Sequence, residues 1–221
     1  MTKRWFEKKF ERDKLHKSED FRFRKTSTLS YIFSNMSITM WLIILNVVVF
    51  LFAYILVLVY PESINYFALK PASILRGKYL WTLITHMFSH VYLIHLLINM
   101  FVLFSLGGLC ERIIGRKRFF WFYIVSGLFA GILSVILAGY YGYGLGERVF
   151  GSPDVYMIGA SVAIFAIAGL FVVLLPKLRF TIIFFPFFSL PAYFMVPVVL
   201  FITWVISVIA NLPIGNVAHF G

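Results

Sequence analysis

Long apolar segments constrain the fold of this chain more than any other feature of its sequence. The first runs from Ile38 to about Tyr60 without a charged residue, and Pro61 and Glu62 follow it. At a rise of about 1.5 Å per residue, a helix of this length crosses a hydrocarbon core of about 30 Å. Five further apolar runs follow, at residues 92–111, 119–140, 157–175 and 188–209 and from about Gly215. The sequence therefore predicts an all-α, polytopic membrane helix bundle with six transmembrane helices.

The composition excludes a water-soluble globule, because 61% of the 221 residues are hydrophobic and only 13% are charged. Soluble domains usually have about 25% charged residues. The net charge of +11 does not indicate a nucleic-acid partner, since half of the 20 Lys and Arg residues lie before residue 40, mixed with five acids. We therefore predict a basic, solvated N-terminal arm at residues 1–37 and a membrane domain at residues 38–221.

The orientation in the membrane follows from the distribution of Lys and Arg residues. The arm carries ten of them and the turns at 112–118 and 176–180 carry six, whereas the loops on the opposite side carry four. The positive-inside rule then places the arm in the cytoplasm, with a cell membrane as the expected location. Loops 61–81, 140–156 and 210–216 face outward, and the mixed composition of 61–81 is suited to the lipid interface.

Polar side chains inside apolar runs are costly in lipid and indicate function. His95 and Asn99 are four residues apart in the second run and therefore share a helix face. Ser161 follows the outer Gly-rich loop, and His219 lies near the start of the sixth run. The predicted topology places all four near the outward end. We therefore expect Ser161 as a nucleophile, His219 as its general base, and His95 and Asn99 as donors to an oxyanion.

Other roles are open for several of these residues. His86 and His90 have a spacing that suits metal ligands, but no carboxylate completes a ligand set, so we expect both to cap a helix end at the lipid boundary. No metal or other cofactor is predicted. Ser161 alone could be a structural serine bonded to its own helix. A metal carrier or transporter is a further alternative.

The ordered motifs resemble those of the rhomboid family of intramembrane serine proteases, from about Ile38 to the end of the chain. The matching motifs are His86-x3-His90-x4-His95-x3-Asn99, Gly107-x3-Glu111-x3-Gly115, Gly159-x-Ser161 and Ala218-His219. The resemblance implies six helices, a Ser-His dyad at Ser161 and His219, oxyanion donors at His95 and Asn99, and no cofactor. It also implies that residues 61–81 form a membrane-embedded hairpin, that the fifth helix gates lateral access and that residues 210–216 cap the site.

The family's activity implies an intramembrane serine endopeptidase that cleaves membrane-protein substrates in the lipid bilayer, near the outward end of a transmembrane helix. The alternative is a catalytically silent rhomboid-like protein that binds or escorts membrane clients. Val162 favours this alternative, because the family usually has glycine there and a valine is expected to widen the contact between the fourth and sixth helices. Nothing in the sequence points to an oligomeric state.

The sixth apolar run is short. Only seven residues extend from Gly215 to Gly221, whereas a spanning helix needs about 20. We therefore expect the sixth helix to be truncated and the base at His219 to be poorly held, and a chain extended through the missing apolar segment to be more active.

Overall fold

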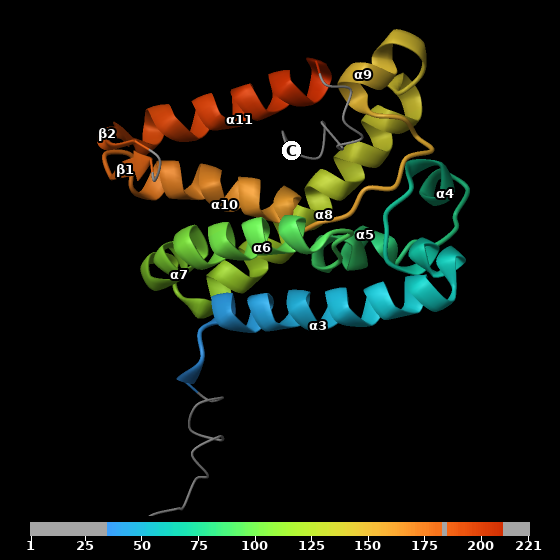
Figure 1. Ribbon diagram of the computed structural model, residues 1–221, viewed down its shortest axis with the longest axis horizontal. Helices are drawn as coiled ribbons and strands as arrows, with labels where there is room; N and C mark the ends of the chain where they lie inside the picture. Colours follow the sequence, from blue (N-terminus) through green and yellow to red (C-terminus); the bar gives the residue numbers. More distant parts are fainter. Residues whose placement is uncertain (1–34, 183–184, 210–221) are drawn as a thin grey trace, which may run out of the picture. The chain divides into compact units, whose positions relative to one another are not determined.

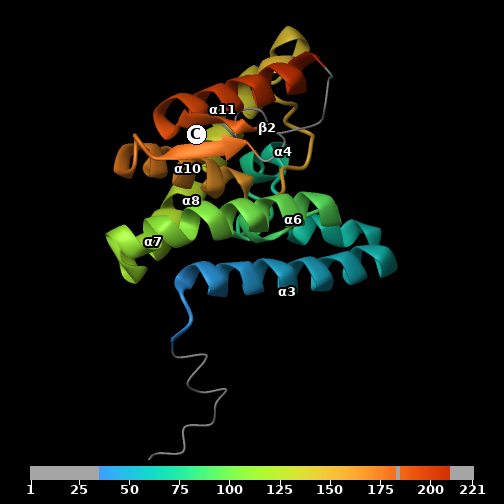
Figure 2. The same cartoon turned by 60° about the vertical axis from the view of Figure 1, so that its left-hand side comes forward.

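The computed structural model describes residues 35–182 and 185–209 (Figures 1 and 2). The chain divides into two compact units, Met1–Met36 and Ser37–Gly221. The second unit is a bundle of helices with one small two-stranded sheet. The arm at residues 1–34, the start of the sixth apolar run and His219 lie outside the described residues.

Three helical segments in the described part of the chain are long and apolar enough to cross a membrane. They are α3 (Ile38–Val59), the continuous segment Leu93–Ile114 and α8 (Arg116–Tyr141). The middle segment consists of α6 (Leu93–Val102), a π-helical turn η3 (Leu103–Gly107) and α7 (Gly108–Ile114). The turn into α8 is formed by Gly115 at φ +88°, a conformation that favours glycine. These segments agree with the first three predicted spans to within a few residues.

The fourth and fifth predicted spans start later than the hydropathy indicates. Helix α10 (Ser161–Leu174) has 14 residues, and α11 (Ala192–Ile209) begins only after a hairpin of β1 (Arg179–Ile182) and β2 (Phe185–Pro191). The two strands pair antiparallel, and the Arg179 side chain donates to the Ser189 carbonyl at 2.9 Å. The prediction that a helix begins at residue 188 is wrong, because residues 188–191 belong to β2. A short apolar run does not distinguish a strand from a helix by hydropathy.

Residues 61–88 form a series of short helical turns between the first two spans. Several of their aromatic rings are exposed and pack on one another, with Tyr66 stacked on Trp81 and Tyr79 edge-on to both. Trp81 Nε1 also donates to the Tyr66 carbonyl at 3.2 Å. Exposed Tyr and Trp rings of this kind gather at membrane–water interfaces. The short elements are η1 (Pro61–Tyr66), α4 (Pro71–Leu75), α5 (Thr82–Thr85), η2 (His86–Phe88) and, in the later Gly-rich loop, η4 (Gly144–Gly146) and α9 (Glu147–Phe150).

Helix α8 packs against α10, α4, α5 and α7 (Figures 1 and 2). Its buried residues include several small ones, and a Cβ atom at Gly127 would lie 2.6 Å from Met87 Cε and 3.4 Å from Ala163 Cβ, so a larger residue there would displace the end of the Met87 side chain. Small residues at helix contacts let backbones approach closely in a membrane, where van der Waals packing drives association. The largest fully buried side chains in the hydrophobic cluster around this contact are those of Tyr123, Phe119, Phe171, Met87, Leu103 and Ile167.

A buried carboxylate holds the beginning of α3. Glu111 Oε1 accepts the Ile38 N–H at 2.8 Å, and Oε2 accepts the Thr39 N–H at 2.8 Å and the Thr39 hydroxyl at 2.7 Å. Ser37 Oγ accepts the Met40 N–H in addition. The first N–H groups of a helix have no partner within the helix, and a negative charge beside them is favourable. Glu111 therefore connects the second span to the first.

We predict that Glu111→Ala lowers the free energy of unfolding by about 2–4 kcal/mol, because it leaves buried N–H groups without an acceptor. Glu111→Gln keeps one carbonyl oxygen and should lose less than half of that. Reversible unfolding in micelles measures both. Glu147→Gln is the matched control, since Glu147 is an exposed acid in the first turn of α9 and should change stability by less than about 0.5 kcal/mol. Equal losses at both positions would contradict the role of Glu111.

Candidate active site

Ser161 is the first residue of α10 and is buried. The segment before it is extended and is hydrogen-bonded to residues 69–90. Leu69 and Met157 form two backbone hydrogen bonds with each other. The Leu69 N–H donates to the Met157 carbonyl at 2.9 Å, and the Met157 N–H donates to the Leu69 carbonyl at 2.7 Å. Gly159 N–H donates to the His86 carbonyl at 2.9 Å. These contacts fix where α10 begins and therefore where the Ser161 hydroxyl lies.

Gly159 allows the ring of His95 to approach the turn that carries Ser161. Its φ of +135° favours glycine, and a Cβ atom there would lie 2.8 Å from His95 Cε1 and 3.1 Å from His95 Nε2. This Cβ position at Gly159 is also 3.6 Å from Ser161 Oγ. The His95 imidazole and the Ser161 hydroxyl therefore border one small space. Two residues that are 66 positions apart in the sequence are brought together here.

Asn99 lies one helical turn after His95 and is buried in α6. Its Nδ2 is 3.0 Å from His90 Nε2, and the Ala160 N–H donates to the same Nε2 at 3.4 Å. A backbone N–H can only donate, so the Ala160 contact makes Nε2 an acceptor for Asn99 as well and puts the ring proton of His90 on Nδ1, which has no hydrogen-bond partner among the described residues. The His90 ring also meets the His95 ring edge-on, with the centroids 5.1 Å apart. His90 thus links Asn99 to the backbone just before Ser161.

His86 and His90 are both buried inside the protein, with exposed fractions of 1% and 4%. Their expected depth at the lipid boundary stays a prediction. His86 Nδ1 lies 2.8 Å from the Thr82 carbonyl, a contact with the backbone of its own short helix, as a capping role predicts. Burial lowers the pKa of His86 to about 4 and that of His90 to about 3, with a smaller contribution from His95 to the second. Both imidazoles are therefore neutral at pH 7.

His90 is the residue whose part in this cluster the sequence reasoning missed. Its contact with Asn99 spans nine residues across a turn, so the four-residue spacing of a helix face does not reveal it. The sequence signal that points to His90 is the motif His86-x3-His90-x4-His95-x3-Asn99, because it contains His90 together with His95 and Asn99. The base proposed at His219 lies outside the described residues, and its role stays a prediction.

Val162 packs against the third span. Its buried side chain forms a small cluster with Ala130 on α8, the third span. A small residue therefore stands opposite the valine and accommodates its branched side chain. The predicted effect on the sixth helix concerns residues that the structure does not describe.

No group of three or more His, Cys, Asp or Glu side chains suited to a metal ion occurs among residues 35–182 and 185–209. A hollow in the described part of the chain runs along α8 at residues 117–129 and does not include the residues around Ser161. The candidate site is therefore a compact polar cluster between α6, α10 and the segment before α6.

Comparison with known proteins identifies the family. A family model described as the Rhomboid domain matches residues 77–221. The chain belongs to the rhomboid family. Together with the three long apolar helices, this membership identifies an integral, multi-pass membrane protein built as a polytopic helix bundle.

Two kinds of curated rhomboid relatives match part of the chain. It is 30% identical over 90 residues to the rhomboid protease GluP of Bacillus subtilis (strain 168). The aligned residues make up 41% of this chain and 18% of GluP. It is 31% identical over 133 residues to the mitochondrial presenilin-associated rhomboid-like proteins of Homo sapiens and Pongo abelii. This alignment covers 58% of this chain and 31% of each relative. The chain thus spans less than a third of the length of these relatives.

We predict that His90→Phe lowers the free energy of unfolding by about 1–3 kcal/mol, because it keeps an aromatic ring but leaves the Ala160 N–H and one Asn99 N–H without their acceptor. Thermal or denaturant unfolding in micelles measures the change. Tyr92→Phe is the control, since the Tyr92 ring is exposed nearby and its loss of a hydroxyl should have little effect. An unchanged stability in His90→Phe would show that the Nε2 contacts contribute nothing.

Proposed function

We propose that this rhomboid protein is an intramembrane serine endopeptidase with Ser161 as nucleophile and His219 as general base. The observation that supports this most is the shared space of the Ser161 hydroxyl and the His95 ring beside Gly159. A buried serine at the beginning of a helix, next to donors from another span, suits acyl transfer. Family membership supports the same reaction class.

In the proposed mechanism the Ser161 oxygen attacks the carbonyl carbon of the scissile peptide bond while its proton passes to the imidazole of His219. The carbonyl oxygen becomes an oxyanion. The intermediate collapses when the C–N bond breaks and the imidazolium returns its proton to the leaving amine. Water then hydrolyses the acyl-enzyme by the same steps and restores the serine.

The oxyanion requires donors that are fixed before the reaction begins. The backbone N–H of Ser161 belongs to the first turn of α10, where N–H groups have no carbonyl within the helix and the helix dipole is positive. The Asn99 amide has two N–H groups, and the contact with His90 uses one of them. The other is proposed to donate to the oxyanion together with an N–H of His95. His90 then acts as a positioning residue for Asn99.

The proposed substrates are membrane proteins that present a transmembrane helix in the bilayer, cut near the outward end. Ser161 follows the Gly-rich loop that the charge distribution places outside, with the N-terminus in the cytoplasm. The escort alternative rested on Val162. The escort alternative stays a prediction, because the sixth helix, whose packing Val162 is expected to affect, lies outside the described residues.

We expect Ser161→Ala and His219→Ala each to abolish cleavage of a model transmembrane substrate, because each removes one chemical partner of a dyad. The double variant should be no slower than either single one, since the two residues act as a unit. A fluorophosphonate probe should label the wild-type protein and not Ser161→Ala. Ser134→Ala is the matched control, because Ser134 is a buried serine whose hydroxyl donates to Ala130 O at 2.7 Å. Labelling that survives in Ser161→Ala, or a folded wild type without labelling, contradicts the proposal.

Asn99→Ala should lower kcat by roughly ten- to a thousandfold with little change in KM, as expected when one oxyanion donor is lost. Asn99→Asp should be slower still, because a carboxylate repels the developing negative charge. Steady-state cleavage of a reconstituted substrate separates kcat from KM. A fully active Asn99→Asp enzyme would remove Asn99 from the oxyanion role.

A further inference from the structure

A groove runs along one face of α8, away from the candidate active site. It lies between two rows of side chains that are each spaced four residues apart, as ridges on a helix surface are. One row holds Lys117, Trp121, Val125 and Phe129. The hollow is shallow and open to the surroundings, with a volume of about 790 Å³.

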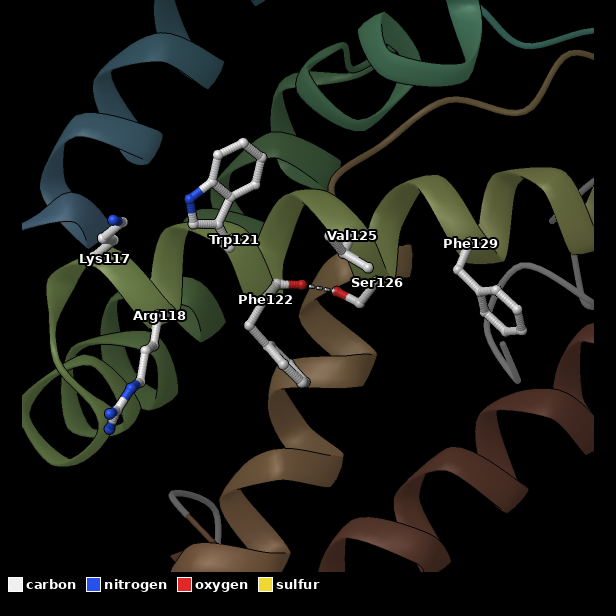
Figure 3. Close-up of a pocket in the computed structure, with 7 residues that line it drawn as sticks. All are labelled: Lys117, Arg118, Trp121, Phe122, Val125, Ser126 and Phe129. Atoms are coloured by element: carbon white, nitrogen blue, oxygen red, sulfur yellow. Dashed lines mark hydrogen bonds between the residues drawn. The ribbon is translucent and has the colours of Figure 1, made fainter.

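The second row closes the groove from the other side. It consists of Arg118, Phe122 and Ser126. The Ser126 hydroxyl donates to the Phe122 carbonyl at 2.6 Å, so it is already bonded to its own helix (Figure 3). The surface of the groove is therefore apolar along its whole length, and at one end it consists of the side-chain stems of Lys117 and Arg118, whose charged ends lie beside the groove.

The two cations are available for a ligand. Both Lys117 and Arg118 are exposed, and neither has an acidic side chain within 4 Å among the residues described. Their neighbour Arg116, in contrast, approaches the buried Glu111 carboxylate at 4.0 Å. The large apolar side chains are equally open, with exposed fractions of 54% for Trp121, 58% for Val125 and 60% for Phe129.

We propose that this groove binds an anionic phospholipid, with its phosphate on Lys117 and Arg118 and one acyl chain along the apolar part. From Lys117 to Phe129 the groove extends about 18 Å at about 1.5 Å per residue, close to the depth of one leaflet of a hydrocarbon core about 30 Å thick. A soluble anion would leave the apolar part uncovered, whereas a phospholipid matches both ends. The charge distribution places these cations in the cytoplasmic leaflet, where anionic lipids attract basic residues beside a span.

A second copy of the chain fits the groove less well. In a twofold dimer with its axis along the membrane normal, equal depths face each other, so Lys117 and Arg118 of one copy would approach the same cations of the other. The bulky Trp121 and Phe129 also differ from the small residues that usually line contacts between spans. A lipid headgroup instead neutralises the cations.

The test uses tryptophan quenching by phospholipids with brominated acyl chains, in nanodiscs that contain the full chain. Brominated phosphatidylglycerol and brominated phosphatidylcholine are compared at equal amounts. The fluorescence quenched in the wild type but not in Trp121→Phe comes from Trp121, which separates its signal from that of the other four tryptophans. We expect phosphatidylglycerol to quench Trp121 more strongly, and a higher salt concentration to weaken this preference.

Charge variants test the headgroup contact. Lys117→Gln and Arg118→Gln should each lower the preference for phosphatidylglycerol about fivefold, since one basic residue near an anionic surface contributes about that factor. Arg112→Gln is the matched control, because Arg112 is exposed near the same end of the membrane domain but does not line the groove. It should leave the preference unchanged.

Three results would overturn the proposal. Equal quenching by the two lipids would mean that the groove accepts any acyl chain. No quenching by either would mean that protein, such as a second copy, covers it. An equal loss in Arg112→Gln would mean a general surface potential rather than a site. Because the wild-type comparison needs no protease activity, its failure is distinguishable from failure of the proposed function.

Discussion

Non-helical backbone at membrane depth must find its hydrogen-bond partners within the protein, and this requirement determines how the site is built. The extended segment before α10 meets it almost entirely through residues 69–90. Leu69 pairs with Met157, the His86 carbonyl accepts the Gly159 N–H, and His90 accepts the Ala160 N–H. Residues 61–90 are therefore more than a connection between two spans. They supply the partners that allow a serine to stand at the beginning of a short helix.

The motif Gly107-x3-Glu111-x3-Gly115 has a physical reason at each position. A Cβ atom at Gly107 would lie 3.1 Å from both Leu103 Cδ1 and Phe119 Cζ, so a side chain there would crowd the core. Glu111 accepts the first N–H groups of α3, and Gly115 adopts the positive φ that turns the chain from α7 into α8. An acidic residue inside a span usually indicates function. Here the carboxylate joins the first two spans at the end opposite the candidate active site, and its role is structural.

The sequence predicts the long spans well because hydropathy over about 20 residues reports directly on the surrounding lipid. It predicts shorter elements poorly. Residues 188–191 are as apolar as a helix interior, yet they pair with β1, and α10 begins at Ser161 rather than 157 because the preceding residues pair with Leu69. The approach of His95 to Ser161 follows the prediction that they share a depth. The contact between His90 and Asn99 could not be predicted from helical spacing, because a turn separates the two residues.

The double hydrogen bond between Leu69 and Met157 also has a mechanical consequence. Residues 61–81, with their exposed aromatic rings, are the part of the chain best suited to grip the membrane surface. Lys70 strengthens the connection through its ion pair with Asp154 at 3.2 Å. Only three residues separate Met157 from Ser161, so a lateral force on the interfacial turns is passed to the serine with little slack. The position of Ser161 is thus tied to the interfacial turns through a short, hydrogen-bonded connection.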